Sequence, residues 1–389
     1  MKKKLSKVLS FMLIAMLCIG STTFASAGTK KVKDETYWNA VEGVYWQFIP
    51  STGTLMIYGE GAMGDYEFDD YYKTYMLKSS LRYPWQNHAE EITKIKICNG
   101  ITHIGNWAFA GLRAVTKVEI GNTVKDIGDG AFAYCRNIKE LSFPDSVKEI
   151  GFQSFKSNMN LEKVDFNKVE KIGNQSFYNC VSLYGIVIPD AVKEIDGSYP
   201  FSITRNIKFL GKTMPTLTNI DEYVMWQSAQ GVKLNIYIPK GADKASFERE
   251  FNKYNLYGYA SKHPECKLTC SYIEYDDTKA KEIASNLKVK ASTSKLVKGV
   301  KVKASVSGDV KELKDLGYTV KYKYYRSTKK TTGYSLMKET KNSTYKNTAG
   351  KKGQKYYYKV AIEVTDPCTD VIYKSSIKSQ TPASRTFRK

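Results

Sequence analysis

Histidine is scarce in this chain, with three residues among 389: His88, His103 and His263. No serine, threonine or cysteine lies in a nucleophile motif. Phosphate-binding glycine loops, zinc spacings and dinucleotide fingerprints are also missing. Hydrolytic, metal-dependent and nucleotide-dependent chemistry therefore has no support in the sequence. We expect a protein that is not an enzyme and that needs no cofactor and no metal ion.

Long apolar runs are missing beyond the N-terminus. A membrane-spanning helix needs ~20 consecutive apolar residues, and no later segment has them, nor is a sorting motif of the LPxTG type visible. The apolar run VLSFMLIAMLCIG follows the basic start MKKKLSK and precedes Ala25-Ser26-Ala27. This pattern predicts a secretory signal peptide over residues 1–27. A membrane anchor is the alternative, although the run is short for one.

A repeat of 22 to 24 residues occupies the chain from Ile92 to Leu210. Each copy opens with the apolar pattern I-x-x-I-x-I, which is typical of a short strand with one buried face. The copies begin at Ile92, Val115, Ile138, Leu161, Leu183 and, truncated, Ile207. A phenylalanine recurs late in five copies, at Phe109, Phe132, Phe155, Phe177 and Phe201. A fixed period of this length predicts a solenoid, in which these rings would stack into one buried ladder.

The repeat motif I-x-x-I-x-I-P-x-x-V-x-x-I-G-x-x-A-F-x-x-C resembles the BspA-type leucine-rich repeats of bacterial surface proteins. The third copy carries Phe143, Pro144, Val147, Ile150 and Phe155 in register. The resemblance implies a leucine-rich repeat solenoid of short parallel strands with turns and short helices. It also implies a secreted or surface-associated binding protein, such as an adhesin. A secreted enzyme with accessory repeats and a purely structural cell-surface spacer are the alternatives.

Residues 28–91 are expected to form an N-terminal cap, and residues 92–270 the solenoid with degenerate closing units. The first coil of a solenoid exposes an apolar edge that a terminal unit must cover. The segment before the repeats resembles the cap of the same family. The residues expected to cover the edge are Trp46, Leu55, Ile57, Met63 and Trp85.

Residues 276–389 form a different, C-terminal module. Several short alternating strands separated by polar turns predict an all-β sandwich. The segments KYYRSTKK at 323–330 and GQKYYYKV at 353–360 resemble fibronectin type III modules. The early core tryptophan of those modules is missing here, and an immunoglobulin-like variant fits about as well.

Six cysteines follow the predicted signal peptide. Cys135 and Cys180 occupy the same repeat position two copies apart. Stacked strands lie ~4.8 Å apart, so these two would be about 10 Å apart, beyond the ~7 Å limit for a disulfide. They are better interpreted as small buried apolar residues. Cys266 and Cys270 are a near pair for which a disulfide stays open.

The strand residues between the buried ones should face outward on one side of the solenoid. This face is mixed in charge and has no aromatic row, so it lacks the stacking platform of a single-strand nucleic-acid binder. We predict that it binds an extracellular protein or glycan; a merely soluble surface is the competing interpretation. The candidate ligand-binding residues are Lys94, Lys96, Lys117, Glu119, Glu140, Ser142, Lys163 and Asp165.

Charge is distributed unevenly. Residues 276–389 hold 27 basic and 10 acidic side chains, a net charge of +17, whereas residues 28–275 hold 29 of each. A basic module attracts polyanions without choosing among them. Because secretion disfavours nucleic acid, we predict attachment to an anionic cell-wall polymer; a lysine excess that only aids solubility is the alternative. The candidate contacts are Lys329, Lys330, Lys351, Lys352, Lys355, Arg385, Arg388 and Lys389.

Overall fold

The computed structural model describes residues 43–66, 83–196, 201, 204–219, 233–257, 269–296, 299–366, 368, 371–378 and 380–387. The predicted signal peptide lies outside them. The chain divides into two compact units. The solenoid unit comprises residues 1–205, 213–234 and 243–270, and the C-terminal unit comprises residues 206–212, 235–242 and 271–389. Residues 206–212 and 235–242, which we expected in the solenoid, therefore cluster with the C-terminal module.

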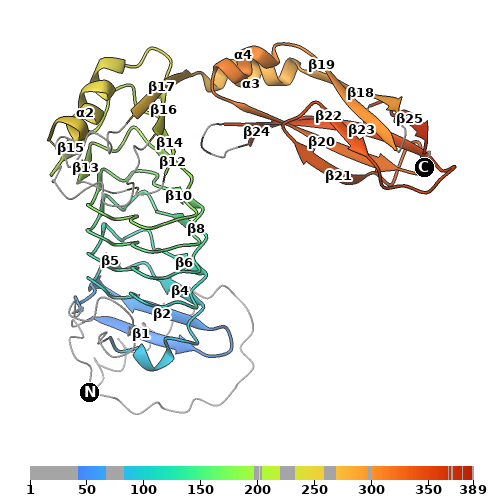
Figure 1. Cartoon of the computed structure of the whole chain (residues 1–389). Helices are drawn as coiled ribbons and strands as arrows, with labels where there is room; N and C mark the ends of the chain where they lie inside the picture. Colours follow the sequence, from blue (N-terminus) through green and yellow to red (C-terminus); the bar gives the residue numbers. More distant parts are fainter. Residues whose placement is uncertain are drawn as a thin grey trace. The chain divides into compact units, whose positions relative to one another are not determined.

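The solenoid unit is a stack of coils (Figure 1). The opening apolar pattern of each copy forms a short strand. These first strands are β4 (Lys94–Ile97), β6 (Lys117–Glu119), β8 (Glu140–Ser142), β10 (Lys163–Asp165) and β12 (Gly185–Ile188). Upstream, β1 (Val44–Ile49) and β2 (Thr54–Gly59) form an antiparallel hairpin, and β2 continues in parallel onto β4 with Leu55 opposite Ile95. A 3-10 turn, η2 (Gln86–His88), follows Trp85.

Each coil also contains a second short strand that the sequence analysis did not predict. The second strands build one seven-stranded sheet in the order β15-β13-β11-β9-β7-β5-β3. They are β3 (Gly61–Ala62), β5 (Ile101–Ile104), β7 (Asp126–Ile127), β9 (Glu149–Ile150), β11 (Lys171–Ile172), β13 (Glu194–Asp196) and β15 (Thr216–Thr218). The strand pairings in this sheet are parallel. Parallel strand pairings are thus present on two sides of the coils.

The predicted phenylalanine ladder is confirmed. Phe109, Phe132, Phe155 and Phe177 are at most 1% exposed. Successive ring centroids from Phe109 to Phe201 lie 5.1, 5.3, 5.3 and 5.9 Å apart, with the rings stacked. Trp85 stacks on Phe109 at 5.4 Å and so extends the ladder into the segment before the repeats. The core of this unit is therefore a continuous column of aromatic rings between two walls of aliphatic strand residues.

The recurring glycine of the I-G pair is required by close backbone approach between coils. A Cβ atom on Gly105 would lie 1.8 Å from the carbonyl oxygen of Gly64, and one on Gly128 would lie 2.7 Å from the backbone nitrogen of Asn106. Contacts this short with backbone atoms cannot be relieved by moving a side chain. Glycine at this position therefore sets how tightly the coils stack.

Cys135 and Cys180 are buried, as expected, but they are more than apolar filling. The Sγ of Cys135 donates a hydrogen bond to the carbonyl of Phe109, and the Sγ of Cys180 donates to that of Phe155. Asn158, at the same position of the intervening coil, donates through Nδ2 to the carbonyl of Phe132. This position supplies a donor to the coil before it. Burial raises the pKa of both thiols to about 12, so they stay protonated donors.

The C-terminal unit begins with strands that come from three parts of the chain. β14 (Asn206–Phe209), β16 (Lys233–Pro239) and β17 (Thr269–Tyr275) follow one another in one sheet. β14 and β16 pair in parallel, with Lys208 opposite Tyr237. The helix α2 (Lys244–Tyr257) follows Pro239-Lys240-Gly241 and belongs to the solenoid unit. α3 (Asp277–Asn286) then follows β17 directly.

Two antiparallel sheets make up most of the C-terminal unit (Figure 1). One has the order β18-β19-β22, and the other runs β21-β20-β23-β24, with β25 also paired to β23. Their strands are β18 (Lys288–Lys295), β19 (Val300–Ser307), β20 (Thr319–Ser327), β21 (Ser335–Thr340), β22 (Thr344–Asn347), β23 (Lys355–Thr365), β24 (Val371–Lys374) and β25 (Ala383–Thr386). The unit is strand-rich, as predicted. The all-β description is wrong in one respect, because α3 and α4 (Val310–Asp315) lie among these strands.

Capping side chains allow the two helices to form where the sequence pattern indicates strands alone. Asp276 accepts a hydrogen bond from the backbone of Lys279 at the start of α3, and Asp309 accepts one from Glu312 at the start of α4. Acceptors at this position satisfy backbone groups that a helix leaves free at its N-terminus.

None of the helices among the described residues has the length and apolar character of a membrane-spanning helix.

Candidate functional site

The predicted binding face lies on the first strands of four coils. Three of its eight residues, Lys94, Lys96 and Glu119, are half-buried, and the other five are exposed. The strand register places Lys94 opposite Lys117 and Lys96 opposite Glu119. Farther along, the register pairs Glu140 with Lys163 and Ser142 with Asp165. The strands β4 and β6 belong to a different sheet from β8 and β10, so the face consists of two strand pairs.

Glu119 ties the first strand pair together. Its carboxylate lies 2.8 Å from the Nζ of Lys94 and 2.8 Å from the Nζ of Lys117. Partial burial alone would raise the pKa of Glu119, but the hydrogen bonds and charges of the two lysines lower it. The carboxylate therefore stays ionised at neutral pH. Glu119 therefore neutralises part of the lysine charge on this face.

A second row of charged side chains runs along the seven-stranded sheet, and sequence reasoning missed it. The second row consists of His103, Asp126, Glu149, Lys171 and Glu194, which the strand register places in line. His103 Nδ1 contacts Asp126, and its Nε2 lies 3.5 Å from Asp65. Lys171 lies 3.0 Å from Glu194, and this hydrogen bond raises the pKa of Lys171.

Beside the second row lies a parallel line of lysines around one glutamate. Glu170 lies 2.5 Å from the Nζ of Lys193 and 3.7 Å from that of Lys148. The hydrogen bond from Lys193 is the main cause of a lowered pKa at Glu170. The signal for both lines was present in the sequence, as V-K-D-I-G, V-K-E-I-G, V-E-K-I-G and V-K-E-I-D. Two charged residues between two apolar ones recur in four copies.

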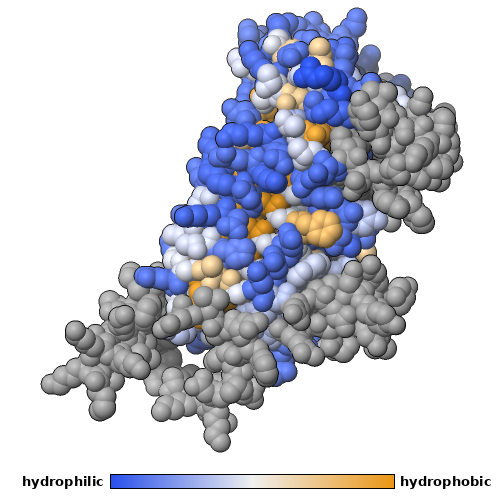
Figure 2. Space-filling model, turned by 90° about the vertical axis from the view of Figure 1, so that its left-hand side faces the viewer, coloured by the Kyte–Doolittle hydropathy of each residue, from blue (hydrophilic) through white to orange (hydrophobic). Residues whose placement is uncertain are grey.

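Exposed apolar side chains are few on the described part of the solenoid. Figure 2 shows a face on which hydrophilic residues predominate and hydrophobic residues form small areas among them. The large apolar side chains with the greatest exposure here are Tyr184 at 64%, Tyr45 at 47% and Phe152 at 38%. These side chains are spread over separate coils. The surface of this unit therefore offers mainly charged contacts.

The structure brings the predicted basic contacts of the C-terminal unit to one end of a sheet. Ser327, at the end of β20, pairs with Tyr357 near the start of β23, so the turns that follow β20 and precede β23 lie at the same end. We call this the basic end. It comprises Lys329, Lys330, Lys351, Lys352 and Lys355, all of them exposed. Arg388 and Lys389 lie outside the described residues.

Aromatic rings accompany the basic end. The guanidinium of Arg326 lies 4.4 Å from the ring centroid of Tyr356, and the Nζ of Lys355 lies 5.6 Å from that of Tyr357. Arg385 pairs with Tyr356 across the strands, is half-buried, and donates to the carbonyl of Thr293. Arg385 therefore has a structural contact that the five exposed lysines do not share.

Catalytic or metal-binding groupings are not evident among the described residues. His88 lies 3.2 Å from Glu91, and His103 is held between Asp65 and Asp126. His263 and Cys266 lie outside the described part of the chain. In the described residues, no cluster of three or more histidine, cysteine, aspartate or glutamate side chains could hold a metal ion.

The repeats match a known family model. Residues 83–208 match the BspA type leucine rich repeat region in six copies. The match covers the solenoid repeats and stops at β14. No curated protein matches the chain.

Solved structures similar to this chain are bacterial leucine-rich repeat proteins. A leucine-rich repeat protein from Eubacterium ventriosum is 22% identical, with a TM-score of 0.33 over 53% of this chain and 66% of its own, which is less than two thirds of its length. The leucine-rich repeat protein of T. pallidum is 18% identical, with a TM-score of 0.34 over 49% of this chain and 88% of its own. A leucine rich cell surface protein from Faecalibacterium prausnitzii is 17% identical, with a TM-score of 0.30 over 53% of this chain and 71% of its own.

Proposed function

We propose that this is a non-catalytic binding protein, secreted or held at a bacterial cell surface, whose solenoid contacts an extracellular protein or glycan. The observation that carries the proposal is the ordered lines of charged side chains on the solenoid strands. Parallel strands in fixed register repeat these groups at ~4.8 Å intervals. A regular, rigid array of charges suits recognition of an extended partner better than it suits catalysis. The BspA-type repeat match supports this assignment.

The C-terminal unit supplies attachment in this proposal. Its antiparallel sheets support a sandwich of the fibronectin type III or immunoglobulin-like kind. The five exposed lysines of the basic end, gathered by the sheet register, form a positively charged patch suited to an anionic cell-wall polymer. Flexible lysine side chains suit a polymer with irregular spacing of its charges.

The test is binding of the full chain to isolated cell wall, matrix proteins and glycans. One variant replaces the basic-end lysines with glutamine. A matched control neutralises five exposed lysines elsewhere in the same unit: Lys288, Lys290, Lys303, Lys311 and Lys314. We expect the first variant to lose wall binding at ~0.15 M salt, where the Debye length is about 8 Å, and the control to keep it. Equal loss in both would show that net charge acts without a site.

Ligand recognition by the solenoid is tested in the same assay. A third variant changes the exposed residues Lys117, Glu140, Lys163 and Asp165 to serine. A fourth changes Glu149 of the second row and its chain neighbour Lys148. We expect one of these two variants to lose its protein or glycan ligand while retaining wall binding. If the wild type shows no saturable ligand in the panel, the molecule acts as a spacer and the recognition proposal is wrong.

A further inference from the structure

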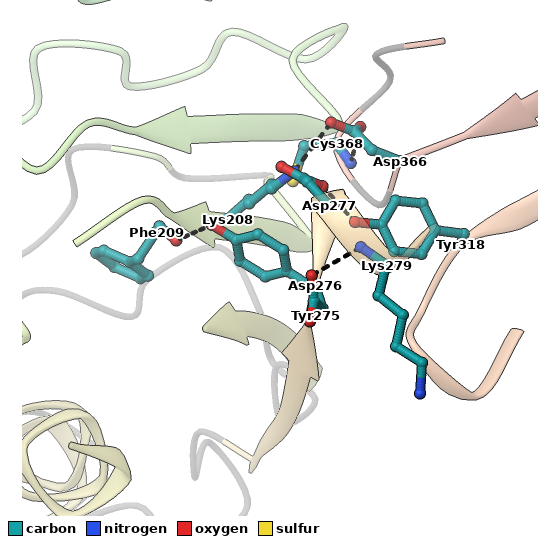
Figure 3. A network of polar contacts seen from close by, with 9 residues as sticks. All are labelled: Lys208, Phe209, Tyr275, Asp276, Asp277, Lys279, Tyr318, Asp366 and Cys368. Carbon is teal, nitrogen blue, oxygen red and sulfur yellow. Dashed lines mark hydrogen bonds and ion pairs between the residues drawn. The ribbon is translucent and has the colours of Figure 1, made fainter. Parts of the chain in front are cut away.

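The C-terminal unit contains a group of one lysine and two aspartates, centred on a buried ion pair, that the binding proposal does not use (Figure 3). Lys208 on β14 has 3% of its side chain exposed, and so does Asp366 at the end of β23. Asp277, the first residue of α3, is 36% exposed. The Nζ of Lys208 lies 3.0 Å from each carboxylate oxygen of Asp277 and 3.3 Å from Oδ2 of Asp366. One buried cation thus faces one buried anion and one that is partly exposed to solvent.

The carboxyl group of Asp366 is oriented by a second contact. The backbone N–H of Cys368 donates to its Oδ1 at 2.9 Å, while Oδ2 faces the lysine. A donor on one oxygen draws electron density from the carboxyl carbon and would stabilise negative charge on that oxygen during attack. The other oxygen is left as a leaving group. This arrangement suits attack by the amine on the carboxyl carbon.

One tyrosine ring lies against the amine, and a second tyrosine orients the second acid. The ring centroid of Tyr275 lies 4.3 Å from the Nζ of Lys208, and the hydroxyl of Tyr275 donates to the carbonyl of Phe209. The hydroxyl of Tyr318 donates to Oδ1 of Asp277. Burial is the main cause of a raised pKa at Tyr318, with the hydrogen bond to Asp277 acting in the same direction. Tyr318 therefore remains a proton donor that holds Asp277 against the lysine.

We propose that Lys208 and Asp366 form an intramolecular amide (isopeptide) bond, with Asp277 as the proton carrier. Lys208 Nζ passes a proton to Asp277 and attacks Cγ of Asp366, so that a carbon–nitrogen bond forms. The bond from Cγ to Oδ2 breaks. Asp277 carries two protons in turn from the nitrogen to Oδ2, which leaves as water. The lysine ammonium and the aspartate carboxylate thus become one amide and one water, and Asp277 ends as it began.

Two physical effects favour this condensation in the folded chain. Groups held in contact react with effective concentrations of about 10⁵–10⁸ M when well oriented. This high effective concentration favours the amide, although water, which hydrolyses amides, is in excess. The product also removes two charges from a buried place, where the desolvation of an ion is unfavourable. No oxidant, reductant or cofactor is needed for the step.

Mass spectrometry of the intact, folded full chain tests the proposal. We expect the wild type to be lighter by one water than its sequence requires, and Lys208→Arg to have its full sequence mass. Asp277→Ala keeps both reacting groups but lacks the proton carrier, and it should also have its full mass. The control is Lys359→Arg, because Lys359 is also buried but donates to the backbone carbonyls of Ile377 and Lys378. This control should remain lighter by one water.

Peptide mapping then locates the missing water. A branched peptide that joins the segments around Lys208 and Asp366 is the expected product. Water lost at an unrelated aspartate would appear in a linear peptide and would contradict the assignment. A wild-type chain with its full sequence mass would overturn the proposal whether or not any variant folds.

Discussion

Single repeat positions in the solenoid show how a polar atom is satisfied or left without a partner in a stacked core. The position of Cys135, Asn158 and Cys180 carries a donor for the carbonyl of the preceding coil. The position just before the ladder phenylalanine behaves differently. It holds alanine at residues 108 and 131 but serine at residues 154 and 176. Both serines are completely buried, and no partner for either hydroxyl lies among the described residues.

Replacing Ser154 with alanine should therefore stabilise the protein. A buried hydroxyl without a partner costs ~1–3 kcal/mol, and alanine already fits this position in two neighbouring coils. We expect Ser154→Ala to raise the free energy of unfolding by about 1 kcal/mol in urea denaturation. A suitable control is Ala131→Ser, which should destabilise by a similar amount. Lower stability in Ser154→Ala would show that the hydroxyl has a partner.

At the scale of elements, the aromatic ladder couples one coil to the next. Phe155 is fully buried and lies 5.3 Å from the rings of Phe132 and Phe177. Phe155→Ala should cost about 3–5 kcal/mol, since it removes a large side chain from a packed core. Because neighbouring coils share this contact, the whole array should loosen. Thermal unfolding, followed by hydrogen exchange in the adjacent coils, measures both effects.

Phe152→Ala is the matched control for the ladder. Phe152 lies three residues earlier in the same coil but is 38% exposed. Its replacement should change the melting temperature far less than that of Phe155. If the two variants melt alike, Phe155 stabilises the array no more than an exposed ring does, and the prediction is wrong.

The elements that could be predicted from the sequence are those in which the spacing of apolar residues repeats often enough to be recognised. The I-x-x-I-x-I segments and the recurring phenylalanines predict the first strands and the ladder, because apolar spacing reports burial directly. The second strands escaped prediction because two to four residues are too few to show alternation. The helices α3 and α4 escaped because each depends on one capping aspartate.

The candidate sites follow the same division. The outward positions of the first strands could be predicted, because they alternate with the buried residues. The clustering of the basic turns could not be predicted, because it depends on the register between β20 and β23. The group around Lys208 could not be read from the sequence. Its aspartates lie 69 and 158 residues further along the chain, and no local pattern relates positions that far apart.

At the scale of the whole molecule, the C-terminal unit is assembled from three separate segments of the chain. A fragment of residues 276–389 lacks β14, β16 and β17, and with them Lys208. Without Lys208, Asp366 has neither its buried cation nor the partner of the proposed amide bond, and a buried charge left unpaired costs about 3–5 kcal/mol. We expect this fragment to melt at a lower temperature than a fragment of residues 206–389, as followed by circular dichroism. Equal melting temperatures would show that the last segment folds independently of the other two.

The scattered origin of the C-terminal unit also limits how such a gene can be recombined. Because residues 206–212 and 235–242 cluster with residues 271–389, a single crossover near codon 271 would join the last segment of one parent to the β14 and β16 of another. The lysine of one lineage would then have to match the aspartates of the other. A crossover before codon 206 avoids this mismatch, but it transfers β15 and α2 as well. Heritable exchange of this module should therefore carry the end of the solenoid with it.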